Sequence, residues 1–100
     1  MFGRKVAEAP TRAAERSVVA IPASVRLPAG DRIPAQIEDL SASGFRACVQ
    51  GTVHPGMLVR VALPIGRSPT ARVVWVDADQ IGCAFLAWLE PADLSNLLDD

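Results

Sequence analysis

The sequence predicts an all-β domain, an antiparallel barrel or sandwich, that ends in one short helix. From Ser17 onward apolar residues alternate with polar or small ones, which is the pattern of half-buried strands. The strands recur about every 8–12 residues and are separated by turns rich in Gly, Pro and Asp, as in antiparallel barrels and sandwiches. A parallel sheet would need helices between its strands, and no helical pattern lies there.

The alternation gives each expected strand an inward row of side chains. Pro22 falls in the outer row of the first strand, so that strand is expected to bend or to lie at an edge. The inward rows are Val19, Ile21, Ala23, Val25 and Leu27, then Ile33, Ala35 and Ile37, then Phe45, Ala47 and Val49, then Val59, Val61 and Leu63. Two further strands are expected in ARVVWV (71–76) and IGCAFLAW (81–88).

The last residues change to a helical period. Pro91 suits the first turn of a helix, and Asp93 near its N-terminus complements the helix dipole. Leu94, Leu97 and Leu98 form one apolar stripe at i, i+3 and i+4. A helix of 91–98 is too short to be stable alone, so we expect it to cap an open end of the barrel beside Trp88.

Composition sets the broad class. The chain has 100 residues, 50% of them hydrophobic and 21% charged, which favours one folded domain. Its net charge of −1 argues against a general nucleic-acid binder, and no apolar run is long enough for membrane insertion. With no export signal in MFGRKVAEAP, we expect a cytoplasmic protein with Cys48 and Cys83 as reduced, buried thiols.

Two parts are expected. Residues 1–16 mix Arg, Lys, Glu, Ala and Pro without an apolar face, so they predict a flexible N-terminal head. Residues 17–98 predict the barrel with its terminal helix, within which the helix takes 91–98.

Catalytic and metal sites have poor candidates. His54 is the single histidine and lies in a turn, without a second histidine or a thiolate partner. DADQIG (77–82) has two acids spaced like part of a calcium loop, but Ile81 and Trp88 stand where two further oxygen ligands are needed, so it predicts a hairpin turn. We expect no enzyme, no metal and no cofactor.

Two polar motifs suggest a binding site. Arg12 and Arg16 carry planar, forked donors that suit phosphate and the O6/N7 edge of guanine, although a solvated charged segment would also explain them. In the turn after residue 38, Asp39 offers an acceptor for guanine N–H groups, Ser41 offers a hydroxyl and Gly44 permits close approach of a backbone. Each motif alone is weak.

In this order the two motifs resemble the signature of the PilZ domain family, Arg12-x-x-x-Arg16 before the first strand and Asp39-x-Ser41-x-x-Gly44 between two strands. GFR after the turn, VVWV in the penultimate strand and IGCAF before the helix add to the likeness, which covers roughly 12–98. The resemblance implies a six-stranded antiparallel barrel with a C-terminal helix that binds the bacterial second messenger cyclic di-GMP on its outer surface.

The resemblance also assigns roles. Arg12 and Arg16 look like the arginines that hold the phosphates and the guanine Hoogsteen edges. Asp39 and Ser41 match the polar turn residues that contact guanine, and Gly44 matches the close-approach glycine. Arg46 is a further contact that neither motif fixes, and Ser43 ranks below Ser41 because its position is variable in the pattern.

The expected function is a single-domain cyclic di-GMP receptor and adaptor that orders its RxxxR segment on binding and signals to an unidentified protein partner. The alternative is a nucleotide-independent protein-interaction module in motility or surface-attachment machinery. A small-barrel nucleic-acid binder ranks third, because the charge balance is acidic and surface aromatics for base stacking are few.

Overall fold

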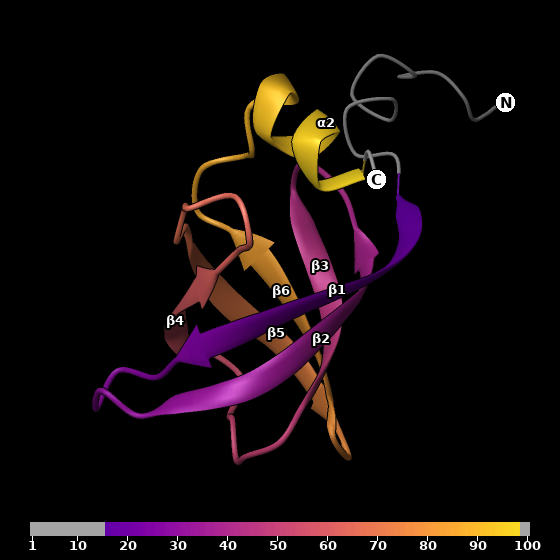
Figure 1. The fold of residues 1–100 in the computed structure, drawn as a ribbon. Coiled ribbons are helices and arrows are strands. Elements are labelled where there is room, and N and C mark those ends of the chain that lie inside the picture. Colours follow the sequence, from indigo (N-terminus) through magenta and orange to yellow (C-terminus); the bar gives the residue numbers. More distant parts are fainter. Residues whose placement is uncertain (1–15, 99–100) are drawn as a thin grey trace, which may run out of the picture.

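A computed structural model describes residues 16–98, and it is a closed barrel of six antiparallel strands followed by one helix. The strands follow the order β1-β2-β3-β6-β5-β4 around the barrel (Figure 1). The elements are β1 (Ser17–Arg26), β2 (Arg32–Leu40), β3 (Gly44–Val49), β4 (Leu58–Ala62), β5 (Thr70–Asp77), β6 (Gln80–Phe85) and α2 (Pro91–Leu98). The all-β prediction is confirmed, and of the two architectures that the pattern left open the structure is the barrel, as the family resemblance implied.

The alternating pattern forms the core. The rows that contain Ile37, Phe45, Val61 and Ile81 point into the barrel, where these four side chains are at most 2% exposed. The rings of Phe45 and Phe85 pack at 5.5 Å between centroids, a spacing usual for tilted aromatic pairs. Burial of apolar surface from all six strands stabilises the closed barrel.

Barrel closure rests on a short contact. β1 pairs with β4 only over Ser24–Arg26, while it pairs with β2 along most of its length. Pro22 lies in the part of β1 that has β2 as its single neighbour, so its missing N–H removes no bond to β4. A register shift lies between Val18 and Ile21, whereas the pairing with β2 is regular at Pro22 itself.

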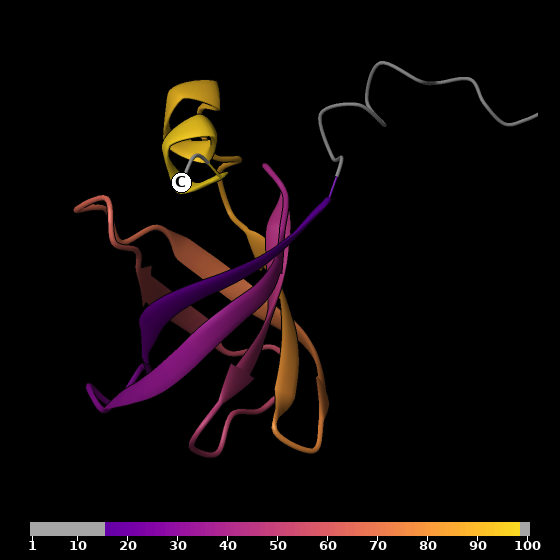
Figure 2. The same ribbon diagram turned by 45° about the vertical axis from the view of Figure 1, so that its right-hand side comes forward.

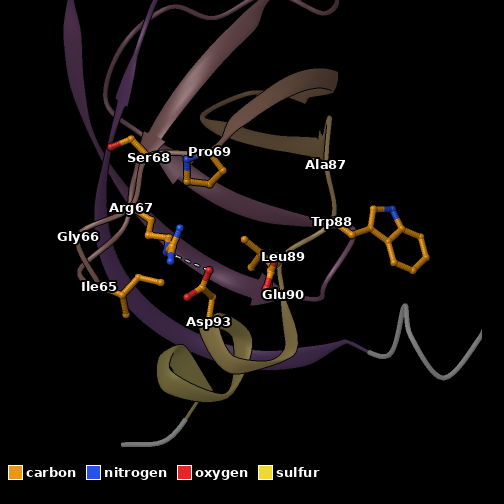
Figure 3. A pocket seen from close by; sticks show the side chains of 10 residues that line it. All are labelled: Ile65, Gly66, Arg67, Ser68, Pro69, Ala87, Trp88, Leu89, Glu90 and Asp93. Carbon is orange, nitrogen blue, oxygen red and sulfur yellow. Dashed lines mark ion pairs between the residues drawn. The ribbon is translucent and has the colours of Figure 1, made fainter.

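Helix α2 lies over one end of the barrel (Figures 1 and 2). Leu94 and Leu97 pack partly buried against the core, but no residue of the helix is fully buried. Arg67 in the β4–β5 loop binds the first-turn Asp93, with 3.2 Å between Nε and Oδ2. The helix caps the open end as expected, but Leu89 is the buried residue there, whereas the Trp88 indole points away (Figure 3).

Candidate functional site

A β-bulge in β2 places two carboxylates on the outer wall. The register with β3 shifts between Ile37 and Asp39, so one extra residue is inserted at Glu38. Ile37 and Leu40 are both fully buried, which leaves the two residues between them on the outside. Strict alternation after Ile37 would instead have turned Asp39 inward.

Asp39 binds Arg16 across the start of the barrel. Arg16 Nη1 lies 2.9 Å from Asp39 Oδ1, and the side chains are 60% and 19% exposed, respectively. Ser17 pairs with Leu40, so the beginning of β1 runs beside the end of β2 and brings Arg16 to Asp39. An ion pair this exposed contributes about 1 kcal/mol or less, so a ligand can displace it at low cost. Arg12 lies outside the described residues.

Ser41 shapes the turn with its own hydroxyl. Its Oγ accepts hydrogen bonds from the backbone N–H groups of Ser43 and Gly44, both at 3.2 Å. Its backbone N–H donates to the Gly44 carbonyl at 2.9 Å, and the residue is 1% exposed. The hydroxyl therefore organises the bend. Ligand contact by Ser41 stays a prediction, and this burial gives it no support.

Ser43 is the more accessible hydroxyl of the turn. Its Oγ lies 3.1 Å from Ser41 Oγ, and the residue is half-buried at the wall of an outer depression. The sequence pattern ranked Ser43 below Ser41, whereas the folded turn exposes them in the reverse order.

Gly44 is required by the neighbouring strand. It pairs with Ala84 of β6, and a Cβ at Gly44 would overlap the backbone carbonyl oxygen of Cys83. From the sequence we expected that Gly44 allows close approach between the backbone and a ligand. The structure shows close approach by β6, and the ligand contact stays a prediction.

Arg46 is held in a polar network on the outer wall. Its Nη1 donates to Glu38 Oε1 at 2.9 Å and to Gln80 Oε1 at 3.2 Å. The Gln80 amide donates in turn to Glu38 Oε1 at 3.0 Å, so the network links β2, β3 and β6. Two partners hold the guanidinium in place on the outer wall, and ligand contact by Arg46 stays a prediction.

Trp75 was not among the predicted site residues. A second bulge, between Val73 and Trp75 in β5, leaves Val74 and Trp75 both exposed on the outer wall. Trp75 pairs with Gly82, and a Cβ at Gly82 would overlap the indole. Asp77 pairs with Gln80 at the hairpin, so the next pairs along the two strands are Val76 with Ile81 and Trp75 with Gly82. The pairing of Trp75 with Gly82 could therefore have been predicted from the sequence.

These side chains surround an open depression of about 200 Å³ on the outer wall of β3, β6 and β5. Two arginines, one tryptophan and two glycines are among the residues that line it. Asp39 joins it indirectly, through Arg16. The lining residues are Arg16, Ser43, Gly44, Phe45, Arg46, Val74, Trp75, Gly82, Cys83 and Ala84. Such a surface can bind an anion with planar rings, because arginines bind phosphates and indoles stack on bases.

Both cysteines are free thiols. Cys83 belongs to the core cluster, and burial raises its pKa to about 12, so this thiol stays protonated at neutral pH. Cys48 is half-buried rather than buried as expected, and its Sγ donates to Asp79 Oδ2 at 3.5 Å. Desolvation, followed by that hydrogen bond and the nearby charge of Asp79, raises the pKa of Cys48 as well.

A larger depression of about 570 Å³ lies between the β4–β5 loop and the start of α2 (Figure 3). None of the predicted site residues lines it, and the Arg67–Asp93 ion pair crosses it. Arg16, Gly44 and Arg46 line the smaller depression on the barrel wall, which is therefore the candidate site. Within residues 16–98 no helix is long and apolar enough to cross a membrane.

Comparisons with known proteins agree with this architecture. A solved structure of the PilZ domain of CeSA from a cellulose-synthesizing bacterium has a similar fold, with a TM-score of 0.62 and 15% sequence identity. The match covers 84% of this chain and 95% of that one. No curated protein sequence matches. The family model described as PilZ domain matches residues 10–99, and the chain therefore belongs to the PilZ domain family.

Proposed function

We propose that this chain is a receptor for cyclic di-GMP. PilZ domains are a family of cyclic di-GMP-binding domains rather than catalysts. The observation that carries the proposal is the meeting of Arg16, Arg46 and the Trp75 indole around one open depression on the barrel wall. Arg16 lies just before β1, whereas Arg46 belongs to β3 and Trp75 belongs to β5.

The donors and acceptors suit this ligand. Arg16 and Arg46 can offer forked N–H donors to a phosphate or to the O6/N7 edge of guanine. Asp39 accepts from the guanine N1–H and N2–H groups, and Trp75 provides an apolar face on which a base stacks. The depression of about 200 Å³ is shallow, so the nucleotide lies over it and reaches the residues before β1.

Binding exchanges one partner of Arg16 for another. In the structure Arg16 binds Asp39, and a ligand that contacts both residues replaces this exposed ion pair. Arg12 then joins Arg16 on the ligand, which orders the RxxxR segment against the wall. Ordering costs about 1–2 kcal/mol per fixed backbone residue, so only the residues nearest the ligand become fixed.

The signal is the surface made by the ordered segment and the nucleotide together. A protein partner that contacts this surface distinguishes the bound receptor from the free one, as in other order–disorder switches. Because the messenger acts inside the bacterial cell, the same proposal places the chain in the cytoplasm.

Isothermal titration calorimetry with cyclic di-GMP tests the proposal. We expect a dissociation constant in the micromolar range or tighter, which corresponds to about −8 kcal/mol or stronger. GMP is the control, and it should bind far more weakly because it offers a single guanine and a single phosphate. Absence of heat and of amide shifts at about 100 µM nucleotide, well above the expected constant, would exclude the receptor function.

A nucleotide-independent protein-interaction module is the second candidate. It is favoured by the engagement of Ser41 inside its own turn, which explains one signature residue without a ligand. The same titration separates the two functions, because only the receptor binds cyclic di-GMP.

A further inference from the structure

We propose that a row of three arginines on the opposite wall of the barrel binds an acidic segment of a partner protein. Arg26 of β1 pairs directly with Arg32 of β2 on one side and with Arg60 of β4 on the other. All three are exposed, and their strands are adjacent, so the three side chains emerge side by side. We call Arg26, Arg32 and Arg60 the arginine row.

The arginine row borders a depression of its own. Small residues in the adjoining positions of β1 and β4, Ser24 and Ala62, leave an open hollow of about 260 Å³. Ser68 contributes a hydroxyl at its edge. Guanidiniums and hydroxyls are hydrogen-bond donors, and this combination suits carboxylates.

The row lacks acidic partners within the described part of the chain. Arg16, Arg46 and Arg67 each form an ion pair with a carboxylate at 2.9–3.2 Å. No such pair involves the arginine row among residues 16–98. Like charges directly opposite each other in a sheet are destabilising, and the chain as a whole has a net charge of −1. A bound carboxylate would relieve this repulsion.

The surroundings favour protein over nucleic acid or membrane. An adjoining depression of about 430 Å³ joins Arg26 and Arg60 to Leu58, Pro28 and Ala29. Leu58 is 45% exposed, so its side chain provides an apolar contact surface beside the positive charges of Arg26 and Arg60. Neither tryptophan lines these hollows, which leaves bases no indole to stack on. One exposed leucine is a small anchor for a bilayer.

The geometry suits an acidic helix. Adjacent strands are separated by about 4.8 Å, and side chains four residues apart on a helix are about 5–6 Å apart. Glutamates at i and i+4 can therefore meet neighbouring guanidiniums when a helix crosses the strands.

This surface is separate from the candidate nucleotide site. In the strand order of the barrel, β1 lies opposite β6, and the views of Figures 1 and 2 place them on different walls. The inference adds a partner to the proposed receptor, and it depends on that function only in requiring a protein partner. It is tested without nucleotide, so its failure and that of cyclic di-GMP binding are distinguishable.

The test uses the full chain and a synthetic helical peptide with glutamate at every fourth position. A peptide with glutamine at those positions is the control. We expect the glutamate peptide alone to bind, and to shift the amide resonances of Ser24–Arg26, Arg32 and Arg60–Ala62. Shifts confined to residues 43–46 and 74–84, or equal binding of both peptides, would overturn the proposal.

Variants assign the binding to the arginine row. Arg26→Gln with Arg60→Gln should weaken peptide binding about tenfold, because two charged contacts are lost. Arg16→Gln with Arg46→Gln is the control, since it removes the same charge from the wall that carries the other depression, and without nucleotide it should change peptide binding less than about twofold. Equal losses would indicate non-specific attraction and contradict the proposal, as would binding of single-stranded DNA or phosphatidylglycerol vesicles in place of the peptide. Amide spectra of the free variants check that each one is folded.

Discussion

The Trp75 indole lies over Gly82 on the outer wall, so closely that a Cβ at Gly82 would overlap the ring. The two residues are paired across β5 and β6. The glycine gives the indole a flat backbone surface to rest on, at the edge of the depression that also contains Arg16 and Arg46. A glycine on a strand can thus determine where an aromatic side chain lies.

We predict that Gly82→Ala will displace the indole and weaken cyclic di-GMP binding while the barrel stays folded. The added methyl meets a side chain that is 40% exposed and can turn outward. Tryptophan emission, recorded with Trp88→Phe so that only Trp75 is observed, should shift to the red. An unchanged emission maximum with unchanged affinity would contradict this account.

Gly44→Ala should instead destabilise the barrel. Its Cβ would overlap the carbonyl oxygen of Cys83, which is backbone and cannot rotate away. We expect a loss of about 1–3 kcal/mol in the free energy of unfolding, as for other overpacked positions. Guanidinium denaturation measures this loss, and Gly82→Ala is the matched control with the smaller loss. The prediction fails if the two variants are equally stable.

Trp75→Ala should weaken cyclic di-GMP binding by about 1–3 kcal/mol, the usual contribution of one stacked base. Trp88→Ala is the control, because that indole is 52% exposed and does not line the depression. Calorimetry on both variants separates the effects. Equal affinities for the two would remove Trp75 from the site.

Ser41→Ala should mainly lower the stability of the protein, whereas Asp39→Ala should mainly weaken nucleotide binding. Without the Ser41 hydroxyl, two backbone N–H groups lose their acceptor in a buried turn, which should cost about 1–3 kcal/mol of stability. Asp39→Ala loses one exposed ion pair, so stability should change by less than about 1 kcal/mol while nucleotide binding weakens. Thermal melts and cyclic di-GMP titrations distinguish the two variants. If Asp39→Ala unfolds the protein but leaves its nucleotide affinity intact, Asp39 has a structural role in the turn instead.

Stability should fall in alkaline solution because of Cys83. Burial raises its pKa from 9.0 to about 12, so between these values the unfolded chain has lost the proton that the folded chain retains. The unfolding free energy therefore decreases as pH rises through this window, and is insensitive to this thiol below it. Cys83→Ala should flatten the dependence in pH-resolved denaturation. Cys48, whose pKa is also raised, should account for part of the dependence that remains in Cys83→Ala.

The strands, their inward rows and the terminal helix could be predicted from the sequence because they depend on local periodicity. Val59 and Val61 are buried as the alternation predicts, and α2 begins at Pro91. The motif pattern likewise identified the turn after β2 as the place to look for a site. These features require only the side-chain period of a strand or a helix and the preferences of turn residues.

The arrangement of the site was decided by the tertiary structure. Asp39 faces outward because of the bulge at Glu38, and the register shift in β5 leaves both Val74 and Trp75 exposed. Ser41 is buried in the β2–β3 turn, which is tied to the segment before α2 by a hydrogen bond of 2.8 Å from the Leu89 backbone N–H to the Ala42 carbonyl. Bulges and strand order depend on which distant strands pair and how their side chains fill one core, whereas a period of two residues carries information only along its own strand.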